Sequence, residues 1–237
     1  MNGAVPQPDH APRVVERTMG VCGELVLREV DGQYEIIADG MFLMDTRDGR
    51  SERAMVSAGL RALPRGRVGV RVLVGGLGVG FTARAALDEP SVDHVHVLEL
   101  EPRVIAWHQG PLAAGAGHLL AEDRCLIECA DLVAWLDAAG SVPETAGYDL
   151  VCLDVDNGPD WTLRTANAWL YGDDALERLR AVTRPGGVVA FWSSAPAPGF
   201  VRWLTQRCSP HGGTVETVTV PTDRGEPDTV YVARLGG

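Results

Sequence analysis

The pattern of hydrophobic positions changes near Val68. Downstream of this residue, short apolar runs alternate with longer segments of helix-forming residues. The runs predicted as strands are 70–74, 94–99, 124–129, 149–154 and 187–193, and the segments predicted as helices are 79–88, 102–114, 131–138, 171–183 and 198–208. Strands that alternate with helices are typical of a parallel sheet with right-handed crossovers. Two final extended runs, 214–220 and 228–234, predict an antiparallel hairpin on the edge of this sheet.

Upstream of Val68 the pattern predicts a small β-meander. Extended runs at 24–29 and 33–38 each lead into an Asp-Gly pair, Asp31-Gly32 and Asp39-Gly40. An Asp-Gly pair between extended runs is a strong hairpin signal. Residues 41–44 predict a third strand.

The predicted domain organisation has two parts. Residues 1–66 comprise a tail (1–12), the meander and a linker helix that begins at Ser51, as N-cap, and continues through Leu60. Residues 67–237 form a Rossmann-like domain that binds the cofactor and carries out the chemistry. We expect residues 14–50 to fold over the mouth of the cofactor cleft.

The strongest local signal is the stretch from Val70 to Gly80, in which an apolar run breaks into four glycines, Gly75, Gly76, Gly78 and Gly80. Such a run predicts a buried strand that turns tightly into a helix and lets a ligand approach the backbone. Glu99 ends the next strand, where an acid accepts hydrogen bonds from ribose hydroxyls. The pattern favours a nucleoside cofactor over a purely structural turn, and its spacing leaves both a dinucleotide and S-adenosylmethionine open.

Acidic residues also follow the next two strands. Asp131 either accepts a hydrogen bond from an exocyclic amine or caps the following helix, and the two roles are compatible. Asp154 and Asp156 stand at the carboxyl end of a predicted strand, where open α/β sheets place ligands. Paired carboxylates there can attract a cationic amine and take its proton. The alternative for Asp156 is a local turn with Asn157 and Gly158.

Composition excludes several classes of function. The chain has 237 residues, of which 46% are hydrophobic and 22% charged, enough for one sizeable core. Its formal net charge is −11 without a basic run, so nucleic acid is not an expected partner. No apolar run approaches the length of a membrane span, and the N-terminus lacks the core of a signal peptide. We therefore expect a cytoplasmic protein that does not bind membranes.

The cysteines and histidines are not expected to form a metal site or to act in catalysis. The five cysteines show no paired metal-ligand spacing, so no metal is expected. His108 and His118 are expected at the surface, whereas one of His94 and His96 is expected to pack in the sheet.

Four segments together resemble one family. They are Val74–Gly80, residues 97–101, residues 128–131 and residues 148–159. They resemble the glycine loop, the ribose-binding acid, the adenine-side acid and the catalytic strand end of the spermidine-synthase-like branch of the class I S-adenosylmethionine-dependent methyltransferase fold. The resemblance implies a seven-stranded, mostly parallel Rossmann-like sheet with an antiparallel C-terminal hairpin, preceded by the β-meander.

The resemblance also implies a set of site residues. Asp154 and Asp156 are the expected catalytic residues. The residues expected to bind S-adenosylmethionine, or its decarboxylated form, are Gly75, Gly76, Gly78, Gly80, Glu99, Leu100, Asp131, Leu132 and Asp154. Members of the family often form dimers, so the possibility of a homo-oligomer stays open.

Departures from the family decide between its activities. Leu77 stands where polyamine-forming members carry an aspartate that anchors an amine, Asn157 stands where a second family aspartate falls, and only Glu52 remains of a Tyr-His-Glu group. These changes favour methyl transfer to a small-molecule acceptor. The first alternative is aminopropyl transfer to a polyamine from decarboxylated S-adenosylmethionine. The second is a protein that binds S-adenosylmethionine without transferring a group or that assists a cyclisation.

Aromatic side chains near the predicted site favour an apolar acceptor, with core packing as the alternative for each. They are Phe42, Trp161, Trp169, Tyr171 and Trp192.

Overall fold

The computed structural model describes residues 11–138, 147–223 and 225–236, so most of the expected tail, residues 1–10, lies outside the described residues. The chain divides into two compact units between Asp48 and Gly49. Each unit is described by itself, and the expected cover of the cleft by residues 14–50 stays a prediction.

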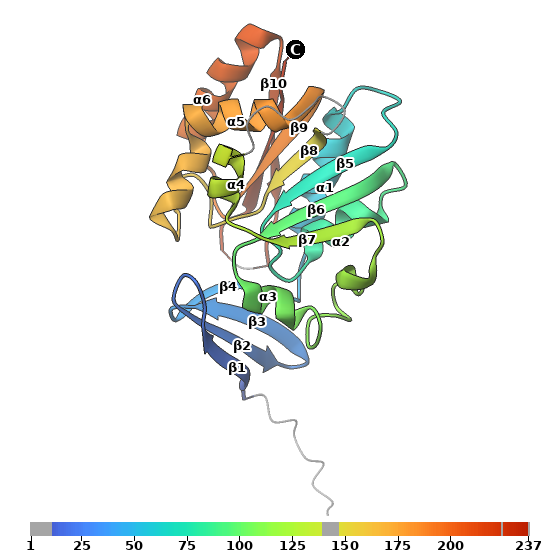
Figure 1. Cartoon of the computed structure of the whole chain (residues 1–237). Helices are drawn as coiled ribbons and strands as arrows, with labels where there is room; N and C mark the ends of the chain where they lie inside the picture. Colours follow the sequence, from blue (N-terminus) through green and yellow to red (C-terminus); the bar gives the residue numbers. More distant parts are fainter. Residues whose placement is uncertain (1–10, 139–146, 224, 237) are drawn as a thin grey trace, which may run out of the picture. The chain divides into compact units, whose positions relative to one another are not determined.

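The first unit is a four-stranded antiparallel sheet in the order β1-β2-β3-β4 (Figure 1). Its strands are β1 (Arg13–Met19), β2 (Glu24–Val30), β3 (Gln33–Ala38) and β4 (Met41–Asp45). Asp31, Gly32, Asp39 and Gly40 all have positive φ angles, as two-residue hairpin turns require. The predicted meander is therefore confirmed, and β1 adds a fourth strand.

The second unit contains a seven-stranded sheet in the order β10-β11-β9-β8-β5-β6-β7. Its strands are β5 (Val70–Gly75), β6 (Val92–Glu99), β7 (Cys125–Cys129), β8 (Tyr148–Leu153), β9 (Thr183–Ser193), β10 (Thr214–Val220) and β11 (Asp228–Arg234). Strands β5 to β9 pair in parallel, whereas β11 pairs antiparallel with β9 and with β10. This topology confirms the predicted fold class.

Six α-helices accompany this sheet in the described residues. They are α1 (Arg50–Ala62), α2 (Phe81–Asp88), α3 (Pro102–Trp107), α4 (Leu132–Ala138), α5 (Asp173–Val182) and α6 (Pro198–Cys208), with short 3₁₀ helices at Leu119–Ala121, Thr165–Tyr171 and Ser209–His211. The helix predicted over 102–114 is too long, because α3 ends at Trp107 and the chain continues as turns. Ser51 is also not the N-cap of α1: Gly49 occupies that position, and Ser51 is buried in the first turn.

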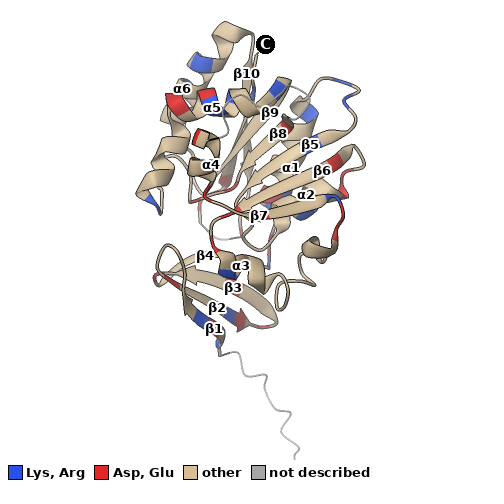
Figure 2. Ribbon diagram, in the orientation of Figure 1, with Lys and Arg blue, Asp and Glu red and all other residues tan. Residues whose placement is uncertain are grey.

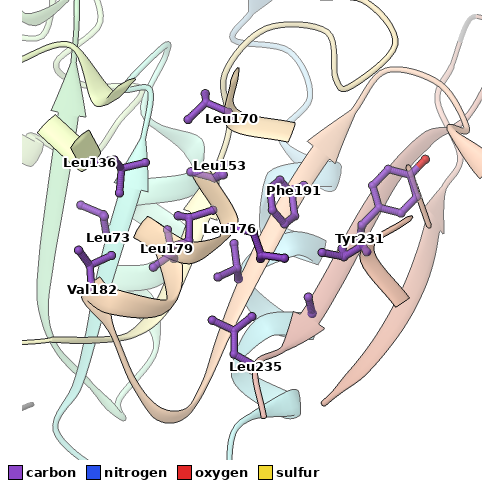
Figure 3. Close-up of a cluster of buried hydrophobic side chains, with 14 of the residues drawn as sticks. Leu73, Leu136, Leu153, Leu170, Leu176, Leu179, Val182, Phe191, Tyr231 and Leu235 are labelled. Atoms are coloured by element: carbon purple, nitrogen blue, oxygen red, sulfur yellow. The ribbon is translucent and has the colours of Figure 1, made fainter. Parts of the chain in front are cut away.

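Helices cover both faces of the sheet (Figure 1). Helices α4, α5 and α6 share a hydrophobic core with one face, in which Leu176, Leu179 and Val182 of α5 pack with Leu73 and Phe191 of the sheet (Figure 3). Helix α1 packs against β9, β11 and α2 on the opposite face. There a Cβ on Gly59 would lie 2.5 Å from Leu150, so α1 lies close to β8.

Helix α1 therefore belongs by its contacts to the second unit, although the sequence analysis groups it with the N-terminal segment.

Among the described residues, no helix is long and apolar enough to cross a membrane. Positive and negative positions are scattered along the described ribbon of each unit (Figure 2).

Candidate active site

The glycine loop connects β5 to α2 at the carboxyl edge of the parallel strands. Gly76, Gly78 and Gly80 have φ angles of 90°, 48° and 93°, and Gly80 is the N-cap of α2. The Gly76 N–H donates to the Leu98 carbonyl at 2.9 Å. A Cβ on Gly76 would lie 2.4 Å from the Asp154 carbonyl oxygen. The loop thus passes so close to the end of β8 that only glycine fits at position 76.

Replacement of Gly76 by alanine is expected to lower the free energy of unfolding by about 2–5 kcal/mol, as backbone strain and overpacking add. Gly66→Ala is a matched control, because Gly66 has a φ of 79° but open space where the Cβ would stand. Urea denaturation should therefore give a clearly smaller loss for Gly66→Ala. Equal losses for the two variants would show that the close approach to Asp154 contributes nothing.

Glu99, the predicted ribose acceptor, braces this loop. Its Oε2 atom accepts the Leu77 N–H and its Oε1 atom accepts the Glu101 N–H, each at 2.8 Å. Burial raises the pKa of Glu99, while hydrogen bonds from the backbone of Glu101, Leu77 and Gly78 act in the opposite direction. Each carboxylate oxygen can accept more than one hydrogen bond. The ribose assignment stays a prediction, and the carboxylate has the capacity for it.

His108 forms a further hydrogen bond with the glycine loop. Its Nε2 atom lies 2.9 Å from the Gly78 carbonyl oxygen, an arrangement in which the imidazole donates. Burial lowers the pKa of His108, which favours the neutral ring. The expectation of a surface position for His108 is wrong, since only 2% of the residue is exposed. His118 is exposed and His96 is buried, both as expected.

A cleft opens beside Glu99 at the ends of β6 and β7. It is lined by Gly76, Leu98, Glu99, Leu100, Ala130, Asp131, Leu132, Val155, Arg164, Asn167 and Leu170. Several predicted cofactor residues therefore meet in one place. Asp131 is the N-cap of α4, because its Oδ1 atom accepts the Val133 N–H at 2.9 Å. Its Oδ2 atom accepts from Nη2 of Arg164 at 3.1 Å.

Asp154 follows β8 and interacts electrostatically with two acids from distant parts of the chain, Glu52 and Asp228. The hydroxyl of Thr82 on α2 donates to its Oδ2 atom at 2.6 Å. Burial raises the pKa of Asp154, and the nearby charge of Asp228 raises it further. Burial and the charge of Asp154 likewise raise the pKa of Glu52, whose Oε2 atom accepts from the Ser51 hydroxyl at 3.0 Å.

This carboxylate group consists of the buried Glu52 and the partly buried Asp154 and Asp228, and it combines the first turn of α1 with the end of β8 and the start of β11. The sequence indicates Glu52, as the remaining member of the Tyr-His-Glu group, but it does not indicate Asp228. The signal that finds Asp228 is spatial, because its strand runs antiparallel and so begins at the edge where the parallel strands end. Carboxylates whose charges raise one another's pKa at such a position favour a cationic ligand.

Asp156 has a different place from Asp154. Its φ angle is 57°, as in the turn that was the alternative interpretation. Burial raises the pKa of Asp156, while the Asn167 side chain and the backbone of Leu163 and Arg164 act in the opposite direction. Asp156 therefore lies beside the segment 163–167, and its expected catalytic role stays a prediction.

Of the aromatic residues expected near the site, Tyr171 is the one whose hydroxyl interacts electrostatically with Asp154 and Asp156. Its hydroxyl donates to the Val155 carbonyl at 3.3 Å. Burial, followed by the charges of Asp156 and Asp154, raises its pKa. Trp161 is exposed, whereas Trp169 and Trp192 are partly buried.

Comparisons with known proteins agree with this architecture. No family model matches the chain. It is 30% identical over 128 residues to a polyamine aminopropyltransferase of Prochlorococcus marinus, and 32% identical over 182 residues to polyamine aminopropyltransferase 2 of Streptomyces coelicolor. These matches cover 53% and 75% of this chain but only 41% and 30% of the relatives.

Solved structures of spermidine synthases have the same fold. One, in complex with the transition-state analogue AdoDATO, has a TM-score of 0.76 over 94% of this chain and 74% of the other, at 16% identity. A second, from Thermotoga maritima, has a TM-score of 0.71 over 94% of this chain and 73% of the other, also at 16% identity. The fold is therefore that of the class I S-adenosylmethionine-dependent methyltransferases. Within that fold the similarities confirm the resemblance to the spermidine-synthase-like branch.

Proposed function

We propose that the chain is a transferase that moves an aminopropyl group from decarboxylated S-adenosylmethionine to an amine acceptor. The relatives that match by sequence are named as polyamine aminopropyltransferases, which favours this activity over methyl transfer, the main interpretation of the sequence analysis. The observation that carries the proposal is the carboxylate group of Glu52, Asp154 and Asp228 at the same sheet edge as the nucleoside cleft. Carboxylates that raise one another's pKa gain stabilisation from a cationic amine.

The cleft fits the nucleoside part of such a donor. Leu98, Leu100, Ala130 and Leu132 supply apolar walls for a base. Glu99 offers acceptors for hydroxyl groups, and the glycine loop lets the donor lie against the main chain.

The carboxylates act on the acceptor. When bound, the sulfonium donor supplies an electrophilic carbon and a neutral thioether leaving group. The amine nitrogen forms the new bond to that carbon, the carbon–sulfur bond breaks, and its electron pair stays on sulfur. Asp154 takes the proton that the nitrogen loses, and its raised pKa brings it closer to the working pH of a general base. Glu52 and Asp228 hold the positive charge of the acceptor.

A second candidate, methyl transfer from S-adenosylmethionine, is favoured by one observation. Leu77 stands in the glycine loop where polyamine-forming members carry an aspartate, and its side chain is buried. It cannot anchor the amine of an aminopropyl group.

Mass spectrometry of the products separates these candidates. The protein is incubated with decarboxylated S-adenosylmethionine or with S-adenosylmethionine, each with putrescine, spermidine and other amines. We expect 5′-methylthioadenosine and an amine extended by one aminopropyl group. S-adenosylhomocysteine with a methylated amine would instead establish methyl transfer. Binding without either product would favour the non-transferase alternative.

The stability of the protein should depend on Glu52 and on pH. Burial raises the pKa of Glu52 from its ordinary value of 4.5 to about 8 in the folded protein, so the folded state binds more protons than the unfolded state between these two pH values. The free energy of unfolding therefore falls as pH rises from about 4.5 to about 8. Glu52→Gln is expected to raise it by about 1 kcal/mol or more at pH 8.

The matched control is Glu216→Gln, at an exposed position on β10. Urea unfolding from pH 5 to 9 should give a flatter profile for Glu52→Gln and the parent profile for Glu216→Gln. A Glu52→Gln profile parallel to that of the parent would contradict the charge repulsion at this position.

A further inference from the structure

The nucleoside cleft contains an ion pair between Arg164 and Asp131. Among the described residues that line the cleft, Arg164 carries the positive charge. Its Nη2 atom lies 3.1 Å from Oδ2 of Asp131, and both side chains are mostly buried, at 29% and 28% exposure. The pair stands beside the apolar walls of Leu100 and Leu132.

The pair fixes the orientation of Asp131. Oδ1 accepts the Val133 N–H of α4, and Oδ2 accepts from Arg164, so each oxygen is held by a donor from a different segment. Two donors on opposite oxygens prevent rotation of the carboxylate. Each oxygen still has a lone pair that can accept a hydrogen bond from a ligand.

The segment that carries Arg164 is itself fastened. The carbonyl oxygen of Arg164 accepts the Asn167 N–H at 2.9 Å, and Arg164 is the N-cap of the 3₁₀ helix Thr165–Tyr171. The backbone of Arg164 is therefore fixed at one end of the side chain, and the Asp131 carboxylate is fixed at the other. Preorganisation of this kind is what a binding group needs to discriminate between ligands.

We propose that Arg164 is the residue that positions Asp131 for selection of the nucleobase. This inference rests on the proposed function, since it concerns the nucleoside of the same donor. A base with an exocyclic amine donates a hydrogen bond to the held carboxylate. A base with a carbonyl at that place brings an acceptor against the carboxylate, so the two groups repel each other and no hydrogen bond forms between them.

Calorimetry with two nucleosides tests the proposal. The ligands are 5′-methylthioadenosine, which has the amine, and 5′-methylthioinosine, which has the carbonyl. Arg164→Met keeps the length of the side chain and removes its charge, while Arg164→Lys keeps the charge without the planar fork. The matched control is Arg178→Met, because Arg178 lies 3.3 Å from Asp137 in an exposed pair of the same type.

We expect the parent protein and Arg178→Met to bind methylthioadenosine alike and in strong preference to methylthioinosine. Arg164→Met should bind methylthioadenosine about tenfold more weakly, the effect of a lost charged hydrogen bond, and should lose most of the preference. Arg164→Lys should recover part of both.

Three results would overturn the proposal. Unchanged binding by Arg164→Met would exclude any contribution of Arg164. Weaker binding of both nucleosides with an unchanged preference would show that Arg164 contributes to the cleft without selecting the nucleobase. Failure of the parent protein to bind either nucleoside would overturn the proposed function as well, so the two failures are distinguishable.

Discussion

Replacement of Asp154 by asparagine is expected to lower turnover by about 100-fold or more while nucleoside binding stays close to that of the parent protein. Asparagine keeps the shape of the side chain and an oxygen that can accept from the Thr82 hydroxyl. It removes the negative charge and the ability to take a proton. The loss should therefore appear in the transfer step and in the affinity for the amine, not in the affinity for the donor.

Asp93→Asn is the matched control, because Asp93 is exposed. It lies near the start of β6, whereas Asp154 follows the end of the parallel strand β8. Its turnover should equal that of the parent. Turnover of Asp154→Asn at the parent rate across pH 6–9 would leave Asp154 with a structural role only. Loss of nucleoside binding together with turnover would show instead that the variant disturbs the glycine loop.

The second large effect is expected at Glu99. Glu99→Ala should weaken nucleoside binding by about 1–3 kcal/mol, the range for removal of a charged hydrogen-bond partner. The structure adds a second consequence, because the Leu77 and Glu101 N–H groups lose their acceptor. The free energy of unfolding should therefore fall as well.

Calorimetry with 5′-methylthioadenosine measures the first effect and urea unfolding the second. Glu216→Ala, on the far edge strand β10, is the control and should change neither. Equal nucleoside affinity for Glu99→Ala and the parent would contradict the ribose assignment. An unchanged free energy of unfolding would contradict the bracing of the loop.

The elements that the sequence predicts well are those with local signals. The apolar runs locate β5, β6, β8 and β9 because strands buried on both faces are nearly continuous in hydrophobicity. The two Asp-Gly turns locate the meander because few other pairs adopt positive φ angles at both positions. The glycine loop, Glu99 and Asp154 are predictable because their places relative to a strand end are fixed by the fold.

The remaining site residues depend on contacts between distant segments. His108 lies within a predicted helix, where a polar side chain is expected at the surface, yet the fold buries it against the Gly78 carbonyl. Arg164 meets Asp131 across 33 residues, and Asp228 approaches Asp154 only because β11 is antiparallel. No local pattern marks such residues, since their burial and partners arise only when the sheet is assembled.

The central claim is most directly tested by the choice of donor. The ratio kcat/KM for decarboxylated S-adenosylmethionine and for S-adenosylmethionine is to be measured with the same amine acceptor, by quantifying 5′-methylthioadenosine and S-adenosylhomocysteine. The account predicts a higher value for the decarboxylated donor, with one aminopropylated amine formed for each 5′-methylthioadenosine. A higher value for S-adenosylmethionine, with a methylated amine as the product, would contradict it.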